Sequence, residues 1–477
     1  MVKILAPGDR SPNPNRLQDY LDYRGVARER ELRNLFSGQV SVGCYLHPRG
    51  KLGRELFLPE NLLYQHCAVI GRSGAGKTEG IVVPWISALL QNGFSVVTID
   101  VKGDLLDRLS PVIRKTRCRS WYWDADNPGK SLSWNWLNEL QPDDDSDIEA
   151  AVTSILGKPN PNDTQPFFYQ RDVRWLRTLI SVVKEVYGNR ATSSDLYELV
   201  ADRSALQDVF RKYPHIRSFA VDLNDMFGFT FDEHARAISG LLNKLSVFRR
   251  RSVIKISERN DFSLSDIDTK PTLLVIGDRQ GNQQSTQLTS LIVSQLFNHV
   301  QRRMAGKVKR RIPMYFMLDE APRLQDKIDL SEILAIARSA NTGMCVVTQD
   351  ITQFEEREAG KIFNNCNTML ILKGSSADSA QFFSKQLGNR KVENLQASRG
   401  RTLSDDFRDI NQGRSFFGVL FRSLFSDDSQ SVSVSDAPVL NTREIMNIPT
   451  GTYSAIAMVK NFGKPTLVDL DLSKRTY

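Results

Sequence analysis

The glycine-rich segment "VIGRSGAGKTEG", residues Val69–Gly80, carries the clearest structural signal in this sequence. It matches the pattern G-x-x-x-x-G-K-T, whose fixed places hold Gly71, Gly76, Lys77 and Thr78. The apolar run "CAVI" precedes it, and apolar residues at helical spacing follow it. A phosphate-binding loop needs this strand–loop–helix context, because glycines let backbone N–H groups approach phosphate oxygens and the helix presents its positive end. The context argues against the alternative, a chance glycine-rich turn.

The loop predicts how a nucleotide would be bound. Lys77 should reach the terminal phosphates, and the Thr78 hydroxyl should bind Mg²⁺. The predicted ATP-binding residues of the loop are Gly71, Arg72, Ser73, Gly74, Ala75, Gly76, Lys77 and Thr78.

A second motif supplies the acidic groups that hydrolysis needs. The apolar run "MYFMLDEA" ends in Asp319 and Glu320. We predict that Asp319 supports Mg²⁺ through water and that Glu320 is the base for the attacking water. Carboxylates at strand ends are common, so the assignment depends on the phosphate-binding loop before it. The next apolar run, "MCVVTQ", ends in Gln349, which we interpret as a γ-phosphate sensor or, alternatively, as a polar residue that marks a strand end.

The nucleotide is predicted to be ATP. Guanine-binding enzymes usually carry N-K-x-D, and the nearest approach is "NKLS" (243–246), which lacks the aspartate and lies in a helical pattern.

Buried strands alternate with helices along most of the chain, which predicts an α/β fold with a mostly parallel sheet. The order of the two motifs is similar to that in RecA-like P-loop ATPases. Between 148 and 250 the pattern is mostly helical, which predicts an inserted all-α domain. The predicted division is a polar N-terminal segment (1–38), the first part of the core (39–141), the all-α domain (142–261) and the second part of the core (262–477).

Composition narrows the class of protein only slightly. Lys and Arg number 63 against 55 Asp and Glu, a net charge of +8, which permits a polyanionic partner without requiring one. The five cysteines are scattered and three lie in or beside apolar runs, so we expect reduced thiols rather than disulfides or a zinc site. The N-terminus has no secretory signal pattern, and no apolar run reaches 18 residues.

Six stretches in order resemble one family. They are "GRSGAGKTEGIVVPWI", "SVVTIDVKGDLL", "SWNWLNEL", "FMLDEAPRL", "ARSANTGMCVVTQDITQFEE" and "VLNTREIMNIPTGTYSAIAMV". Together they resemble the ATPase part of type IV secretion coupling proteins, the TraD/TraG family, which is related to the FtsK and HerA DNA pumps. The stretches "DVKGDL" and "TREIMNIPTG" are the most specific to that family, and the resemblance extends from Phe36 to Val459.

The resemblance implies a hexameric ring that pumps DNA toward a secretion channel. We expect this ring to grip single-stranded DNA mainly through its phosphates, without reading the sequence. It also implies an all-α insertion in the core, as the helical pattern indicates independently. Arg338 matches an arginine that family members are thought to offer to the ATP of the neighbouring subunit; a salt bridge on a helix surface is the alternative. Asp100 and Lys102, in "DVKGD", are expected just behind the residues that touch ATP.

Family members usually begin with membrane-spanning helices, which this sequence lacks. We therefore expect a cytoplasmic protein that docks on a separate membrane anchor protein at the inner face of the membrane, or one that works away from it; a relaxase is a further expected partner. The basic stretch 301–313 should lie at the sheet end opposite ATP, as a contact for DNA or acidic headgroups or as a solvated loop. A cytosolic FtsK/HerA-like pump for duplex DNA and a nucleotide-switched docking protein stay open as alternatives.

Overall fold

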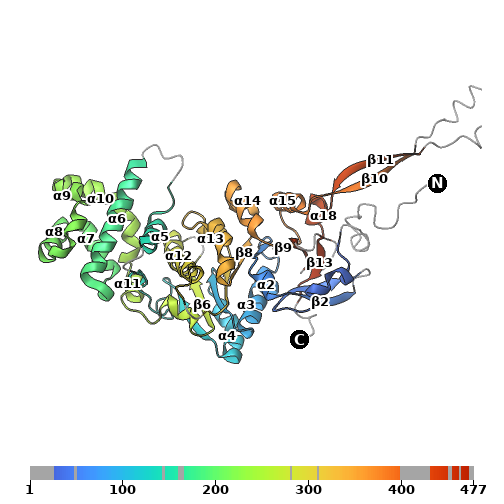
Figure 1. Ribbon diagram of the computed structural model, residues 1–477, viewed down its shortest axis with the longest axis horizontal. Helices are drawn as coiled ribbons and strands as arrows, with labels where there is room; N and C mark the ends of the chain where they lie inside the picture. The colour runs from blue at the N-terminus through green and yellow to red at the C-terminus, as the bar shows by residue number, and fades with distance from the viewer. Residues whose placement is uncertain are drawn as a thin grey trace, which may run out of the picture.

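The computed structural model describes residues 26–47, 51–141, 145–159, 166–279, 282–308, 311–397, 430–448, 454–460 and 464–471. Its centre is an 11-stranded sheet in the order β2-β1-β13-β12-β9-β3-β8-β7-β4-β6-β5 (Figure 1). The strands of this sheet are β1 (Val40–Leu46), β2 (Leu52–Leu58), β3 (Cys67–Ile70), β4 (Ser95–Asp100), β5 (Arg119–Trp123), β6 (Thr272–Gly277), β7 (Met314–Leu318), β8 (Thr342–Thr348), β9 (Thr368–Leu372), β12 (Ser454–Val459) and β13 (Thr466–Asp469).

The strands from β9 to β5 in this order run parallel, and the strands on the other side of β9 pair antiparallel. The expected α/β fold with a mostly parallel sheet is therefore confirmed. In parallel strands every carboxyl end lies at the same edge of the sheet, so loops from distant parts of the sequence meet there.

Helices cover both faces of the sheet, as the alternation of buried side chains requires. Phe316 and Leu318 of β7 belong to one core, and Tyr315 and Met317 belong to the other. The helices of the described residues are α2 (Glu60–Leu63), α3 (Val83–Gln91), α4 (Leu105–Thr116), α5 (Asp145–Leu156), α6 (Pro166–Tyr187), α7 (Ser193–Ala201), α8 (Arg203–Lys212), α9 (Asn224–Gly228), α10 (Phe231–Leu245), α11 (Arg251–Ser257), α12 (Gln283–Met304), α13 (Leu330–Ala337), α14 (Glu356–Asn365), α15 (Ala377–Leu387) and α18 (Thr442–Met446).

The chain between β5 and β6 is helical, and α6 to α10 gather at one end of the molecule, away from the sheet (Figure 1). Side-chain caps start several of these helices. The Thr192 hydroxyl accepts the N–H of Asp195 and the Asp195 carboxylate accepts the N–H of Thr192. At the other end of the molecule, β10 (Asn389–Ala397) and β11 (Gln430–Pro438) form a separate two-stranded ribbon.

The basic stretch 301–313 lies just before β7, and so at the amino edge of the parallel strands, as predicted. Two of its arginines are nevertheless wrongly assigned as contacts for DNA. Arg303 is completely buried, donates to the carbonyl of Ile312 at 2.7 Å and lies 3.7 Å from Asp268. Arg302 pairs with the buried Asp147 at 2.7 Å. Both therefore stabilise the end of α12, because buried carboxylates need a cation.

Of the remaining cations in this stretch, Lys307 and Arg311 are exposed, and positions 309 and 310 lie outside the described residues. All five thiols are free, and all but Cys118 are buried. No helix within the described ranges is long and apolar enough to cross a bilayer.

Candidate nucleotide-binding site

The phosphate-binding loop joins β3 to a π-helical turn, η3 (Thr78–Val82), which continues into α3. Gly74 and Gly76 have φ angles of +78° and +89°, which residues with a Cβ rarely adopt. A Cβ on Gly71 would lie 2.9 Å from the Cβ of Leu372. The shape of the loop therefore requires glycine at these places, as a loop built around phosphate does.

Lys77 is buried at the base of this loop. Its Nζ donates to the carbonyl of Gly71 at 2.5 Å and to that of Arg72 at 3.4 Å. Burial lowers the pKa of Lys77, while the negative charges of Asp319 and Glu320 oppose that shift. The Lys77 ammonium group is thus held at the loop, and the charges of Asp319 and Glu320, two strands away across the sheet, act on it.

The structure brings three of the predicted residues together at the carboxyl ends of β7 and β8. The Gln349 side-chain amide donates from Nε2 to Oε1 of Glu320 at 2.5 Å. Glu320 itself has a left-handed backbone, with φ of +55°, and its N–H donates to Oδ1 of Asp319 at 3.1 Å. This arrangement holds the Glu320 carboxylate beside the predicted sensor and turns it away from the line of β7.

Burial and the adjacent Glu320 carboxylate together raise the pKa of Asp319 to about 6, although the charge of Lys77 opposes this rise. A partly buried carboxyl group next to a second one is costly to ionise. A divalent cation would relieve this cost, because oxygen ligands with negative charge are what Mg²⁺ prefers.

This pKa leads to a prediction for protein free of metal and nucleotide. Folding raises the pKa of this aspartate from 3.8 to about 6. The free energy of unfolding therefore falls as the pH rises through that interval, because the folded state there binds more protons than the unfolded state. Asp319→Asn should therefore increase the free energy of unfolding by roughly 1–3 kcal/mol at pH 8 and by little at pH 4. Urea denaturation of both proteins at several pH values measures this difference.

Adding Mg²⁺ and nucleotide should reverse the order of stability, because the asparagine variant loses a group that supports the metal. Asp107→Asn, at an exposed aspartate of α4, is the matched control. If Asp319→Asn increased the free energy of unfolding by the same amount at all pH values, the result would contradict a raised pKa for Asp319.

Asp100 ends β4, three strands from β3 in the sheet, and Lys102 lies in the turn that follows. The Asp100 carboxylate accepts three backbone N–H groups, from Lys102, Gly103 and Leu105, at 3.1, 2.7 and 2.9 Å. Asp100 therefore shapes the turn that carries Lys102. The Lys102 charge lowers the pKa of both Lys77 and Asp319, so the ammonium group acts on the site through space.

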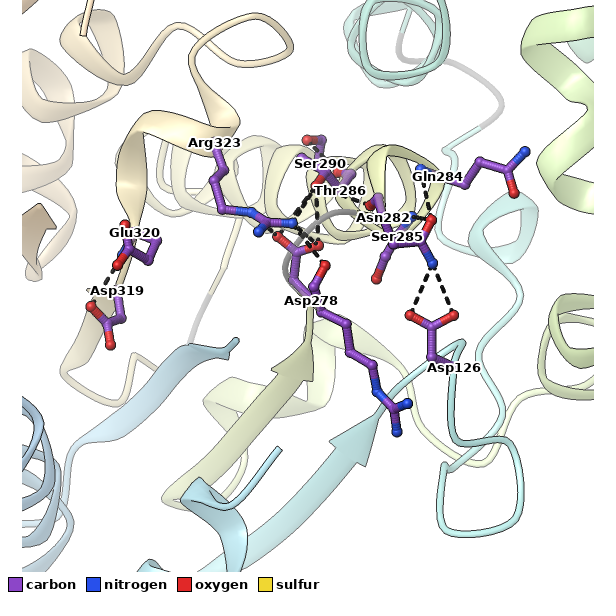
Figure 2. A network of polar contacts seen from close by, with 11 residues as sticks. Asp126, Asp278, Asn282, Gln284, Ser285, Thr286, Ser290, Asp319, Glu320 and Arg323 are labelled. Carbon is purple, nitrogen blue, oxygen red and sulfur yellow. Dashed lines mark hydrogen bonds and ion pairs between the residues drawn. The ribbon is translucent and has the colours of Figure 1, made fainter. Parts of the chain in front are cut away.

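An aspartate lies at the carboxyl end of each of four neighbouring strands, in the order Asp319, Asp100, Asp278 and Asp124 from β7 to β5. Asp100 is occupied by backbone N–H groups, and Asp124 accepts the Tyr122 hydroxyl and the Asp126 N–H. Asp278 pairs with Arg323 (Figure 2). Among the described residues Asp319 accepts the Glu320 N–H and has neither a side-chain partner nor a cation within ion-pair distance, so it keeps more free oxygen than the other three, which favours it as the carboxylate that supports the metal.

Sequence reasoning did not identify Asp278 and Arg323 as part of this region. The signal was present, because "TLLVIGD" ends a strand in an aspartate and "LDEAPRL" carries an arginine three residues after Glu320.

Sequence reasoning also missed a cavity of about 860 Å³ that borders the outer side of the phosphate-binding loop. Its lining residues are Arg72, Ser73, Gly74, Ala75, Asp350, Lys373, Gly374, Ser375, Ser376, Met446 and Asn447. The stretch "TREIMNIPTG" thus contributes to the surroundings of the loop through Met446 and Asn447.

Arg338 does not lie with the other predicted residues. It follows α13 and precedes β8, which places it at the amino edge of the parallel strands, beside His66. The phosphate-binding loop is at the carboxyl edge, so Arg338 cannot reach the nucleotide site of its own chain. Its side chain is exposed, and no carboxylate of the described residues lies within ion-pair distance of it.

Comparison with known proteins places the chain in a family. Residues 28–462 match the family model described as type IV secretory system conjugative DNA transfer, so the chain belongs to that family. Two relatives from Escherichia coli, both called conjugal transfer protein TraG, are 21% and 22% identical over 418 and 485 residues. These matches cover 79% and 92% of this chain. The chain spans 64% of the length of one relative and 71% of the other.

Solved structures support the fold. The plasmid coupling protein TrwB in complex with ADP and Mg²⁺ has a TM-score of 0.64 at 16% identity, covering 94% of each chain. TrwB in complex with a non-hydrolysable GTP analogue has a TM-score of 0.63 at 17% identity, covering 95% of each chain. The chain therefore has the fold of a conjugative coupling protein.

Proposed function

We propose that this protein is an ATPase that uses ATP hydrolysis to move DNA toward a type IV secretion channel. The observation that carries the proposal is the convergence of Lys77, Asp319, Glu320 and Gln349 at one edge of the sheet, in a chain of the conjugative DNA transfer family. The cofactors would be ATP and Mg²⁺, which is consistent with the nucleotides described for TrwB.

The residues fit a magnesium–nucleotide complex. The loop offers backbone N–H groups and Lys77 to the phosphates, and the Thr78 hydroxyl and Asp319 offer oxygen to the metal, directly and through water. Bound Mg²⁺ would neutralise phosphate charge. Glu320 would accept the proton of the attacking water, and Gln349, which now holds the Glu320 carboxylate, would report the state of the γ-phosphate.

We also propose that the chain acts in a hexameric ring, with Arg338 offered to the ATP of the next subunit, and that the helices between β5 and β6 form an inserted domain. A relaxase and a separate membrane anchor are the proposed protein partners. Exposed Arg311 and Lys307 stay candidates for gripping DNA phosphates, whereas Arg303 is excluded by its burial and Arg302 by its ion pair with the buried Asp147.

Stimulation of ATP hydrolysis by DNA tests the proposal. We expect single-stranded DNA of mixed sequence to raise turnover several-fold, and this effect to weaken with added salt because phosphate contacts release counterions. Lys77→Ala, measured in parallel, corrects for contaminating ATPases. Greater stimulation by duplex DNA would favour a FtsK/HerA-like pump, and no stimulation by either form would favour a docking protein.

A further inference from the structure

We propose that Arg323 and Asp278 form a positioning pair that holds Glu320 in its catalytic orientation by anchoring the turn after it to β6 and α12. This inference rests on the proposed role of Glu320 in hydrolysis. Neither residue is placed to touch the nucleotide; both would act through the backbone of Glu320.

The backbone of Glu320 needs support from outside its own strand. Its φ of +55° is unfavourable for a residue with a Cβ. The chain then makes one short 3-10 turn, η9 (Ala321–Leu324), in which the Arg323 N–H donates to the Glu320 carbonyl at 3.0 Å. A single turn of this kind is too short to keep its shape alone, so its orientation depends on what its side chains contact.

Arg323 supplies that contact (Figure 2). Its Nε lies 2.9 Å from Oδ2 of Asp278, and its Nη2 donates to Oδ1 at 3.1 Å. The same Nη2 also donates to the hydroxyl of Thr286 at 2.9 Å and to the carbonyl of Arg279 at 3.1 Å. Figure 2 shows the guanidinium pointing toward Asp278 while Asp319 and Glu320 lie apart from it, on the other side of the turn.

Asp278 is itself fixed. Its side chain is 1% exposed, and its N–H donates to the carbonyl of Asp100 at 3.0 Å. The Thr286 hydroxyl, in the first turn of α12, donates to Oδ1 of Asp278 at 3.1 Å. A planar guanidinium that faces both oxygens of a buried carboxylate allows little freedom of orientation. The pair therefore transfers the rigidity of β6 and α12 to the turn that begins at Glu320.

The chain offers a matched control. Arg250 pairs with Asp126 at 2.8 Å, and Asp126 accepts from the side chain of Asn282, the N-cap of α12, at 3.0 Å. This second pair also supports α12 and is also partly buried, but none of its contacts with the described residues reaches the turn after Glu320. If a loss of kcat came only from loosening α12, it would appear in the variants of both pairs.

The experiment measures kcat for ATP hydrolysis, the Kd for a fluorescent ATP analogue and the unfolding midpoint. The variants are Arg323→Gln, Asp278→Asn, the double variant, and the control Arg250→Gln. We expect Arg323→Gln and Asp278→Asn to lower kcat about 10- to 100-fold with Kd within about twofold of wild type, because displacement of a catalytic group by about 1 Å costs on that scale. The kcat of the double variant should fall no further than that of either single variant, and Arg250→Gln should keep the wild-type kcat.

Arg323→Gln leaves a buried carboxylate without its cation and could fail to fold. The double variant removes both charges, so it keeps the test valid in that case. Unchanged kcat in a folded Asp278→Asn or double variant would overturn the inference, as would an equal loss in Arg250→Gln or a parallel loss of nucleotide affinity. If Glu320→Gln kept its turnover, the proposed function of Glu320 would fail instead, so the two failures are distinguishable.

Discussion

Glu320→Gln should bind ATP normally and hydrolyse it at least about 10²-fold more slowly than the wild type. The amide has nearly the shape of the carboxylate, so the contact with Gln349 can persist, but it cannot accept the proton of the attacking water. Binding should survive because the phosphates would be held by Lys77 and the loop, which the substitution does not touch. Steady-state hydrolysis and titration with a fluorescent ATP analogue give the two quantities.

Glu356→Gln, at an exposed glutamate in the first turn of α14, is the matched control and should keep full activity. Turnover near the wild-type level in Glu320→Gln would show that another group activates the water. Loss of nucleotide affinity would show instead that Glu320 supports binding.

Arg338→Ala should lower hydrolysis by about 10³-fold, which is the scale on which an arginine finger stabilises the charge of the transition state. The structure motivates a role in trans, because Arg338 lies at the amino edge of the parallel strands and the phosphate-binding loop lies at the carboxyl edge. Burial lowers the pKa of the neighbouring His66 to about 4, so Arg338 is the cationic side chain of that pair at neutral pH.

Mixing subunits tests this role. In a ring that combines Arg338→Ala and Glu320→Gln subunits, some interfaces would join an intact Glu320 to an intact Arg338 of the neighbour, and activity should partly return. Co-purification of two differently tagged variants shows that mixed rings form. If mixed rings formed and no ratio restored hydrolysis, Arg338 would have no role in trans. Arg357→Ala, at an exposed arginine of α14, is the control.

Much of the candidate site could be predicted because its motifs are local. The φ angles of Gly74 and Gly76 follow from the loop itself, and the alternation of apolar runs and helices is enough to predict a parallel sheet. Once the strands are parallel, Lys77, Asp319 and Gln349 must meet at one edge, since each follows the carboxyl end of a strand. Which side chains contact one another at that edge could not be predicted from the sequence.

The pattern of charged residues along the sequence was the least reliable guide to which side chains are exposed. Arg303 and Arg311 belong to the same basic stretch, but one is completely buried against Asp268 and the other is exposed. Whether a cation faces water depends on which carboxylate the fold brings to it, and Asp268 is far away in the sequence.

Residue spacing and hydrophobic period act over a few residues, so the amino-acid sequence was enough to predict the loop, the mostly parallel sheet and the strand-end carboxylates. The contacts at the strand ends came from the tertiary structure: Asp278 is the strand-end aspartate that holds a cation, Arg323, whereas Asp319 accepts the Glu320 N–H and pairs with no cation among the described residues. These features depend on the lateral order of the strands and on contacts between segments distant in the sequence, which local periodicity does not encode.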